Sequence, residues 1–192
     1  SVGYVGINFK GNVVMEDLYL PDCNKDTLAY IKRLEAGFNP ATVWSDSKLT
    51  LSKVDLDSFK IYVSSNADVY NFEYLIDAFS STDTTDVDTT PSKFDMELSD
   101  ISLKRGILKY DIIDSSYAQP GVFDYNHIHL SEVLISGYLK SIQTDNLRAE
   151  ISQLSAFDDL THVRINDLKI LDFAMLSDGF SSEQISLQTP KS

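Results

Sequence analysis

The sequence predicts a mainly β protein: an elongated, curled antiparallel sheet like a half-barrel, made of repeated bulged strands with one short amphipathic helix. Three observations predict it, namely a recurring apolar pattern, a hydrophobic share of 43% and a single segment with helical spacing. A chain with this much apolar surface can offset the entropy lost on ordering. We therefore expect most of the 192 residues to be folded.

The recurring pattern has two apolar residues that alternate with a polar one, two intervening residues, and two more alternating apolar residues. Alternation predicts a strand with one buried face, and the extra middle residue would turn the second half over unless a bulge or short turn absorbs it. Each copy therefore predicts a bulged strand or a tight strand pair. The five copies are Val13-Met15-Leu18-Leu20, Val54-Leu56-Phe59-Ile61, Met96-Leu98-Ile101-Leu103, Ile128-Leu130-Val133-Ile135 and Val163-Ile165-Leu168-Ile170, with weaker versions at Ala29-Ile31-Leu34-Ala36 and Ala149-Ile151-Leu154-Ala156.

Polar and mostly acidic residues fill the middle of each copy, and they suit a bulge or turn better than a strand interior. Paired carboxylates also serve as the acid and nucleophile of glycosidases. Because the pairs recur with the pattern, we favour the structural explanation and predict no catalytic residue. The pairs are Glu16-Asp17, Asp57-Ser58, Ser99-Asp100, Ser131-Glu132 and Asn166-Asp167.

One segment has helical spacing. In NFEYLIDAFSS the apolar residues Phe72, Leu75, Ile76 and Phe79 fall at i, i+3, i+4 and i+7, behind a possible N-cap at Asn71. A polar, proline-containing stretch follows and predicts a linker. We therefore expect an N-terminal β unit at residues 1–80 that ends in the helix, a linker at 81–93, and a second β unit at 94–192.

A later loop, DSSYAQPGVFDYN, combines turn residues with the aromatics Tyr117, Phe123 and Tyr125. These aromatic side chains either contact a partner or pack the loop onto the sheet.

Charge and cysteine content exclude several classes of partner and site. The net charge of −13 disfavours nucleic acid and anionic headgroups. The single cysteine, Cys23, excludes an internal disulfide and a cysteine-based zinc cluster. No apolar stretch is long enough to span a bilayer. Since the chain starts at Ser1 directly in strand-like sequence, we expect a fragment whose membrane anchor lies elsewhere.

Common catalytic and cofactor motifs are not found. The sequence has no G-x-S-x-G elbow and neither glycine-rich phosphate-binding motif. His127 and His129 form H-x-H, which on a strand places both rings on one face and could begin a metal site, with only His162 as a further imidazole. The alternative, which we favour, is a pair of solvent-facing strand histidines. We predict no metal site and no cofactor.

The five copies together offer twenty apolar side chains. Full burial would contribute about 1.5–3 kcal/mol each, of order 30–60 kcal/mol in total. Such a face must curl over itself, pack against a second sheet or hold an apolar ligand. The predicted groove-lining residues are Val54, Leu56, Phe59, Ile61, Met96, Leu98, Ile101, Leu103, Ile128, Leu130, Val133, Ile135, Val163, Ile165, Leu168 and Ile170.

A family resemblance rests on the segments GNVVMEDLYLPDCNKDTLAYIKRLEAGF, LSKVDLDSFKIYV and NFEYLIDAF. The chain resembles the N-terminal region of the TamB-like translocation and assembly proteins of Bacteroidetes-type bacteria, within the AsmA/TamB superfamily. In that family a strand followed by a G-D-T-L-type turn recurs. Residues 24–28 (NKDTL) hold the place of the turn, with Lys25 where glycine is common.

The resemblance implies an inner-membrane anchor upstream and a long periplasmic body of strands curled into an open apolar groove, a β-taco. It implies a role in outer-membrane biogenesis, by lipid passage or by outer-membrane protein assembly along that groove. The implied partners are phospholipid acyl chains, outer-membrane protein clients and an outer-membrane assembly barrel. No catalytic residue carries over.

Three hypotheses follow. The first is a non-enzymatic segment of an envelope-spanning conduit or scaffold. The second is an extracytoplasmic β-sheet module that binds protein or glycan through its aromatic loop. The third is a carboxylate enzyme on a β scaffold, which the sequence favours least.

Overall fold

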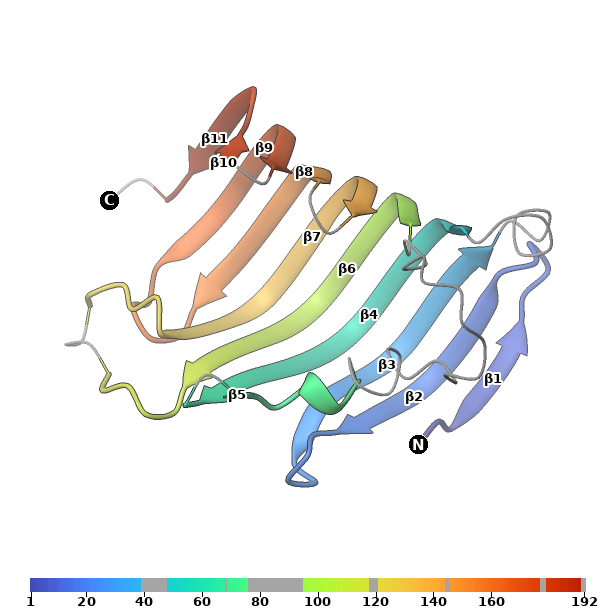
Figure 1. Cartoon of the computed structure of the whole chain (residues 1–192), viewed down its shortest axis with the longest axis horizontal. Helices are drawn as coiled ribbons and strands as arrows, with labels where there is room; N and C mark the ends of the chain where they lie inside the picture. The colour runs from blue at the N-terminus through green and yellow to red at the C-terminus, as the bar shows by residue number, and fades with distance from the viewer. Residues whose placement is uncertain are drawn as a thin grey trace, which may run out of the picture.

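A computed structural model describes residues 1–38, 48–67, 69–75, 95–117, 121–143, 146–176 and 179–190. These residues form one open, curled sheet (Figure 1). The predicted fold class, mainly β with a curled and mostly antiparallel sheet, is confirmed. Its strands are β1 (Tyr4–Ile7), β2 (Val13–Pro21), β3 (Thr27–Phe38), β4 (Lys48–Asn66), β5 (Val69–Tyr70), β6 (Asp95–Ile112), β7 (His127–Gln143), β8 (Asn146–Asp158), β9 (Arg164–Leu176), β10 (Gly179–Ser181) and β11 (Gln184–Gln188).

The strand order is β1-β2-β3-β4-β6-β7-β8-β9-β10, with β11 also paired to β9 and β5 paired to the end of β4. Neighbours are antiparallel except β4 and β6, which are parallel from Lys48↔Asp95 to Ser65↔Ile112. This pairing joins both predicted β units in one sheet, so the predicted division does not correspond to two separate sheets. The predicted linker at 81–93 lies outside the described residues.

The strands bend at single residues with left-handed backbone. A left-handed residue reverses the alternation of side chains, so apolar residues three apart, such as Met15 and Leu18, share a face. Four of the five copies therefore lie within one strand rather than a tight strand pair, and the fifth begins at Val163, one residue before β9. In β2, β4 and β7 the left-handed residue is the second of the two residues in the middle of the pattern, which is where the sequence predicts a bulge. In β6 and β9 the left-handed residue follows the copy of the pattern. These residues are Asp17, Ser58, Glu132, Arg105 and Asp172, with φ of 50°, 57°, 52°, 54° and 50°.

The left-handed residues of β2, β4 and β6 lie in line and form a crease, which we define by Asp17, Ser58 and Arg105 together with Lys32 of β3, which lies opposite Asp17 and Ser58. The register between β2 and β3 is the same on both sides of Asp17, and the register between β3 and β4 is the same on both sides of Ser58. Arg105 continues the line into β6. The strands β2, β3 and β4 therefore bend together without a change of register, whereas the register between β6 and β7 shifts at the crease.

Two rows of paired residues cross the sheet from edge to edge, and all of their side chains are apolar except at Gly137 in the second row. Each row is assembled from successive cross-strand partners, which share a face of the sheet. The first apolar ladder is Val5-Met15-Leu34-Leu56-Leu103-Ile135-Leu154-Leu168-Leu187. The second apolar ladder is Ile7-Val13-Ala36-Val54-Ile101-Gly137-Ile151-Ile170-Ile185.

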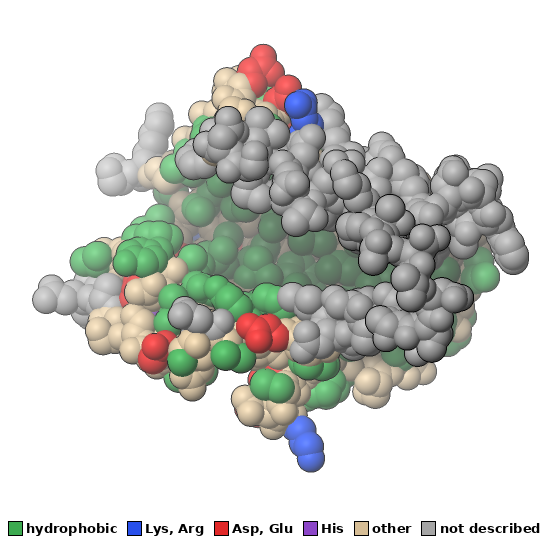
Figure 2. All heavy atoms as spheres, in the orientation of Figure 1, with side chains coloured by type: hydrophobic (Ala, Val, Ile, Leu, Met, Phe, Trp, Pro, Cys, Tyr) green, Lys and Arg blue, Asp and Glu red, His purple; other side chains and the backbone are tan. Residues whose placement is uncertain are grey.

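We call the face that carries both ladders the inner face. Figure 2 shows hydrophobic side chains gathered in the hollow of the sheet. The residues of the buried core cluster lie beside the crease, where the bend brings apolar side chains together. They are Ile31, Leu56, Phe59, Val133 and Ala156, and half-buried ladder residues such as Leu34, Leu103 and Leu154 pack against them.

The opposite, outer face carries charges of alternating sign. Arg33 lies 3.2 Å from Glu16 and 3.4 Å from Glu35, and Lys53 lies 3.5 Å from both Glu35 and Asp55. These ion pairs cross β2, β3 and β4. Because the ion pairs are solvated, each contributes little to stability, but together they keep the outer face hydrated.

The predicted helix is described only in part. Residues 73–75 form one helical turn, and the remainder, including Ile76 and Phe79, lies outside the described residues. The predicted N-cap role of Asn71 is wrong: its side chain accepts a hydrogen bond from the Ser64 N–H (3.1 Å) and donates one to the Tyr62 carbonyl (2.9 Å). Asn71 therefore anchors this turn to β4. Within the described part of the chain, no helix has the length and apolar character that crossing a membrane requires.

Gly106→Ala should destabilise the fold. A methyl group there would lie 2.0 Å from the Phe59 ring, which is 1% exposed. Overpacking of this kind typically costs about 1–3 kcal/mol, which urea unfolding would measure. In a Phe59→Leu background the cost should shrink, because the smaller side chain leaves room. Equal costs in the two backgrounds would contradict the contact.

Candidate functional site

The inner face is the candidate functional site, because it gathers most of the predicted groove residues. Seven of them lie in the two ladders, and others lie beyond the crease in the core or in the row Ile61-Leu108-Leu130. The seven are Val54, Leu56, Ile101, Leu103, Ile135, Leu168 and Ile170.

Val163 does not belong to the groove. It lies in the turn before β9 and is 48% exposed. The prediction was wrong here because the fifth copy begins before its strand does. Met96 and Leu98, which the sequence also predicts to line the groove, pair with Ile142 and Leu139 of β7.

Residues outside the predicted set complete both ladders. Six of them come from the first copy and the two weaker copies of the pattern: Val13, Met15, Leu34, Ala36, Ile151 and Leu154. Gly137 and the edge residues Val5, Ile7, Ile185 and Leu187 belong to no copy. Plain alternation in YVGI and ISL is the only sequence signal for these edge positions.

The inner face has no second layer over it among the described residues, since every described strand contacts only its neighbours in the sheet. Ladder residues such as Leu103, Ile135 and Leu154 consequently remain half-buried. Their side chains are aliphatic and offer no hydrogen-bonding group. These ladder side chains therefore offer apolar contacts.

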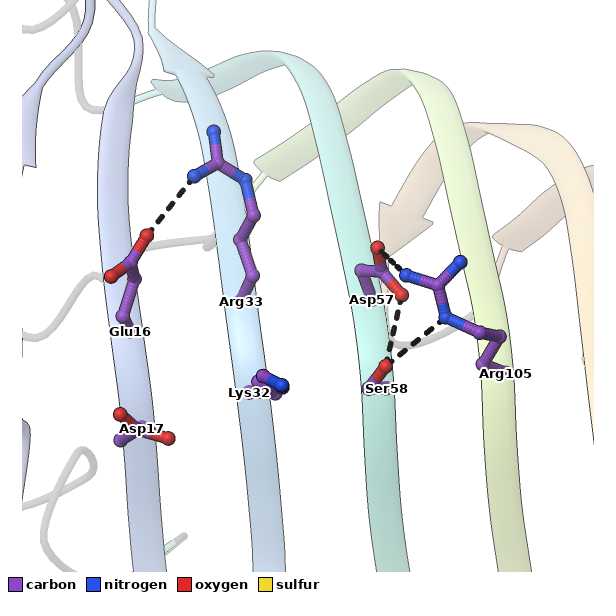
Figure 3. A pocket seen from close by; sticks show the side chains of 7 residues that line it. All are labelled: Glu16, Asp17, Lys32, Arg33, Asp57, Ser58 and Arg105. Atoms are coloured by element: carbon purple, nitrogen blue, oxygen red, sulfur yellow. Dashed lines mark hydrogen bonds and ion pairs between the residues drawn. The ribbon is translucent and has the colours of Figure 1, made fainter.

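A pocket on the outer face lies along the crease (Figure 3). Two of its acidic residues are paired with cations from neighbouring strands: Glu16 with Arg33, and Asp57 with Arg105, whose Nε donates to the Ser58 hydroxyl at 3.2 Å. The third, Asp17, accepts a hydrogen bond from the Tyr30 hydroxyl at 2.6 Å. These acidic middle residues of the pattern are thus held by neighbouring side chains beside the bend. This arrangement agrees with a structural role for them.

Further along the crease, Glu132 accepts a hydrogen bond from Arg164 at 2.7 Å, and this contact lowers the pKa of the Glu132 carboxyl. The recurrence of such pairs on β2, β4 and β7 matches the recurrence of the pattern.

The predicted H-x-H pair lies on the outer face around Asp111. His127 Nδ1 is 3.0 Å and His129 Nε2 is 2.8 Å from Asp111 Oδ1, and the Tyr117 hydroxyl donates to the same oxygen at 3.2 Å. The Tyr117 ring stacks on His127 with centroids 3.8 Å apart. His127 is only 3% exposed, so the expectation of solvent-facing histidines is wrong.

Desolvation raises the pKa of Asp111, but hydrogen bonds with His127 and His129 lower it by more. The pKa of Asp111 therefore lies below its ordinary value. Burial, followed by the charge of Asp111, raises the pKa of Tyr117. Within the described ranges, no three His, Cys, Asp or Glu side chains are placed to hold a metal ion. The cluster fastens the loop after β6 to the start of β7.

Two of the three loop aromatics do not pack onto the sheet. Phe123 and Tyr125 are 63% and 74% exposed, whereas Tyr117 stacks on His127. Cys23 is an exposed free thiol in the turn between β2 and β3. In that turn Lys25 is left-handed (φ 71°), a conformation that glycine adopts without strain.

Comparison with known proteins finds no family model, no curated protein and no solved structure that matches this chain. The resemblance to TamB-like proteins therefore stays a prediction.

Asp111→Asn should weaken the loop anchor, because it keeps the size of the side chain and removes the charged acceptor. Hydrogen bonds to charged groups typically contribute about 1.5–3 kcal/mol, and we expect a loss of that order at pH 7. Since the folded-state pKa lies below the ordinary value of 3.8, the advantage of the natural protein is full above that pH and is lost as the pH falls through the folded-state pKa.

Urea unfolding of both proteins from neutral to acid pH checks this expectation, with exposed Asp100→Asn as the control. The two stability curves should converge in acid. A gap that stays constant with pH would contradict the role of the ionised carboxylate.

Proposed function

We propose that this chain is a non-enzymatic binding segment whose inner face shelters the acyl chains of lipids. The observation that carries the proposal is the pair of apolar ladders, which cross nine strands with Gly137 as the one member that lacks an apolar side chain, and whose members between the two edge strands are mostly half-buried. Burial of apolar area against an alkyl chain is favourable by about 25 cal/mol per Å².

A lipid chain fits this face better than a protein strand does. A client strand must satisfy its own N–H and C=O groups, and the face of a sheet offers none, because its backbone groups are already paired within the plane. An alkyl chain has no such groups. Of the two modes that the resemblance implies, lipid passage is therefore the one this geometry supports.

The dimensions agree with this ligand. With strands about 4.8 Å apart, nine strands give a track of roughly 40 Å. The hydrocarbon core of a whole bilayer is about 30 Å thick, so one leaflet's acyl chain occupies about 15 Å. The track is longer than one chain, as passage along it requires.

We place this activity in the periplasm, within a longer envelope-spanning protein that is anchored in the inner membrane and acts in outer-membrane biogenesis. Support for this setting comes from the resemblance to TamB-like and AsmA-like proteins and from the curled, one-faced apolar sheet that such a role requires.

A photo-crosslinking amino acid at Leu154 tests the proposal. Purified protein is mixed with phospholipid vesicles, irradiated and analysed by mass spectrometry for lipid adducts. Leu154 lies in the first ladder, and Gln153 is its exposed neighbour on the outer face. We expect adducts from position 154 and few from position 153.

Lysine substitutions at positions 154 and 153 provide a matched pair of variants. Leu154→Lys should reduce lipid recovery several-fold, whereas Gln153→Lys should leave it unchanged. Equal adducts from both faces, or none from position 154 in a folded protein, would exclude the inner face as a lipid site.

A second candidate function is supported by the exposed aromatics Phe123 and Tyr125. A loop with such side chains suits recognition of a protein or a glycan. Replacing both by alanine should then abolish binding in a glycan array or pull-down while lipid adducts at position 154 persist. If binding survives this double substitution, the loop is not the recognition surface.

A further inference from the structure

A pocket of about 420 Å³ lies at the end of the sheet that carries the β4–β5 hairpin, the lower end in Figure 1. Three segments that are far apart in the sequence form it: the turn between β2 and β3, the β4–β5 hairpin, and the residue that follows β6. Its volume falls within the range of about 300–1,000 Å³ that is usual for small-molecule sites. None of its described lining residues belongs to the two apolar ladders.

Hydrogen bonds hold the three segments in place. The Ile113 N–H donates to the Ser65 carbonyl at 2.9 Å, which ties the residue after β6 to β4. The Tyr74 hydroxyl donates to the Pro21 carbonyl, which ties the helical turn after the hairpin to the end of β2. Asn71 fastens the hairpin to β4 through its side-chain amide. The pocket is therefore formed before a ligand arrives, so that binding loses little conformational entropy.

The described lining of the pocket is uncharged. Although 23% of the residues of the chain are charged, the nine described lining residues include no Lys, Arg, Asp or Glu. An ionised ligand would lose hydration here without meeting a counter-charge among these residues, which is unfavourable. The lining therefore suits a neutral ligand.

Amide and apolar side chains meet in this lining. Asn24 and Asn66 are exposed, and their side-chain amides have no hydrogen-bond partner among the described residues. Each amide offers two N–H donors and a carbonyl acceptor. Val69 and Ile113 are 58% and 62% exposed, and Tyr70 adds an aromatic ring. The pocket thus combines unpaired hydrogen-bonding groups with exposed apolar surface.

A saccharide has the features that this lining complements. It is neutral, and its hydroxyl groups both donate and accept hydrogen bonds, as amides do. The C–H groups on one face of a pyranose ring form an apolar surface that packs against aliphatic and aromatic side chains. A mono- or disaccharide also has the size that a pocket of this volume admits.

From these observations we propose that the pocket binds a neutral saccharide. The amides of Asn24 and Asn66 bond its hydroxyl groups. Its apolar face packs against Val69, Ile113 and Tyr70. The inference goes beyond the proposed lipid binding on the inner face and does not depend on it.

Cys23 provides a reporter for the test, because it is the only cysteine of the sequence and its exposed thiol lines the pocket. The rate at which the uncharged reagent iodoacetamide modifies this thiol is measured by mass spectrometry with and without sugar. The probes are glucose, galactose, mannose, N-acetylglucosamine, maltose, lactose and chitobiose. We expect at least one of them to slow the reaction in a saturable way, and the charged sugars glucuronate and glucosamine to protect the thiol less.

A thiol outside the pocket controls for general effects of sugar on the reaction. Gln153→Cys in a Cys23→Ser background places a single thiol at an exposed position of the outer face. This thiol should react at the same rate with and without each sugar. Lipid adducts at position 154 report on the inner face separately, so the outcome at Cys23 does not decide the lipid proposal.

Asparagine variants test the two amides. Asn24→Ala and Asn66→Ala change exposed side chains, and each should weaken binding by roughly three- to tenfold, the factor that one neutral hydrogen bond contributes. Asn166→Ala removes an exposed amide of β9 outside the pocket and should leave binding unchanged. Circular dichroism checks that each variant is folded.

Four results would overturn the saccharide site. They are a Cys23 thiol that no neutral sugar of the panel protects, stronger protection by the charged sugars than by the neutral ones, protection that survives both pocket substitutions, and an Asn166→Ala variant that weakens binding as much as they do.

Discussion

The structure depends on one constraint, which is that apolar residues three positions apart must face the same side of the sheet. A regular strand cannot do this, and a left-handed residue between them can. In β2 and β4 this residue is Asp17 or Ser58, and the neighbouring strands bend at the same height. The crease, the curl and the apolar hollow all follow from that alignment.

The chemistry of the two faces differs as a result. The inner face carries aliphatic ladders, whereas the outer face along the crease carries ion pairs such as Glu16 with Arg33 and Asp57 with Arg105. A left-handed non-glycine residue is strained by about 1–2 kcal/mol. Asp tolerates this conformation better than branched apolar residues because its short polar side chain can hydrogen-bond locally, so Asp17 both permits the bend in β2 and keeps its outer side polar.

The sequence predicts the fold class, the bulged strands and much of the inner face, because those depend on spacing within a strand. It does not predict features that depend on which strands are neighbours. Asp111 meets His127 only through the register of β6 and β7, and the parallel pairing of β4 with β6 follows from a long connection that resembles a linker. Spacing also does not determine which residue becomes left-handed: in β6 it is Arg105, beside the Gly106 that admits Phe59, rather than Ser99 or Asp100.

The parallel seam between β4 and β6 has a consequence for folding kinetics. On either side of it the chain forms antiparallel neighbours through short sequence separations, which close quickly because little chain entropy is lost. The seam itself joins segments about fifty residues apart in sequence, from Lys48↔Asp95 to Ser65↔Ile112. We therefore expect two separate meanders to form early, and their union at the seam to limit the rate at which the complete sheet appears.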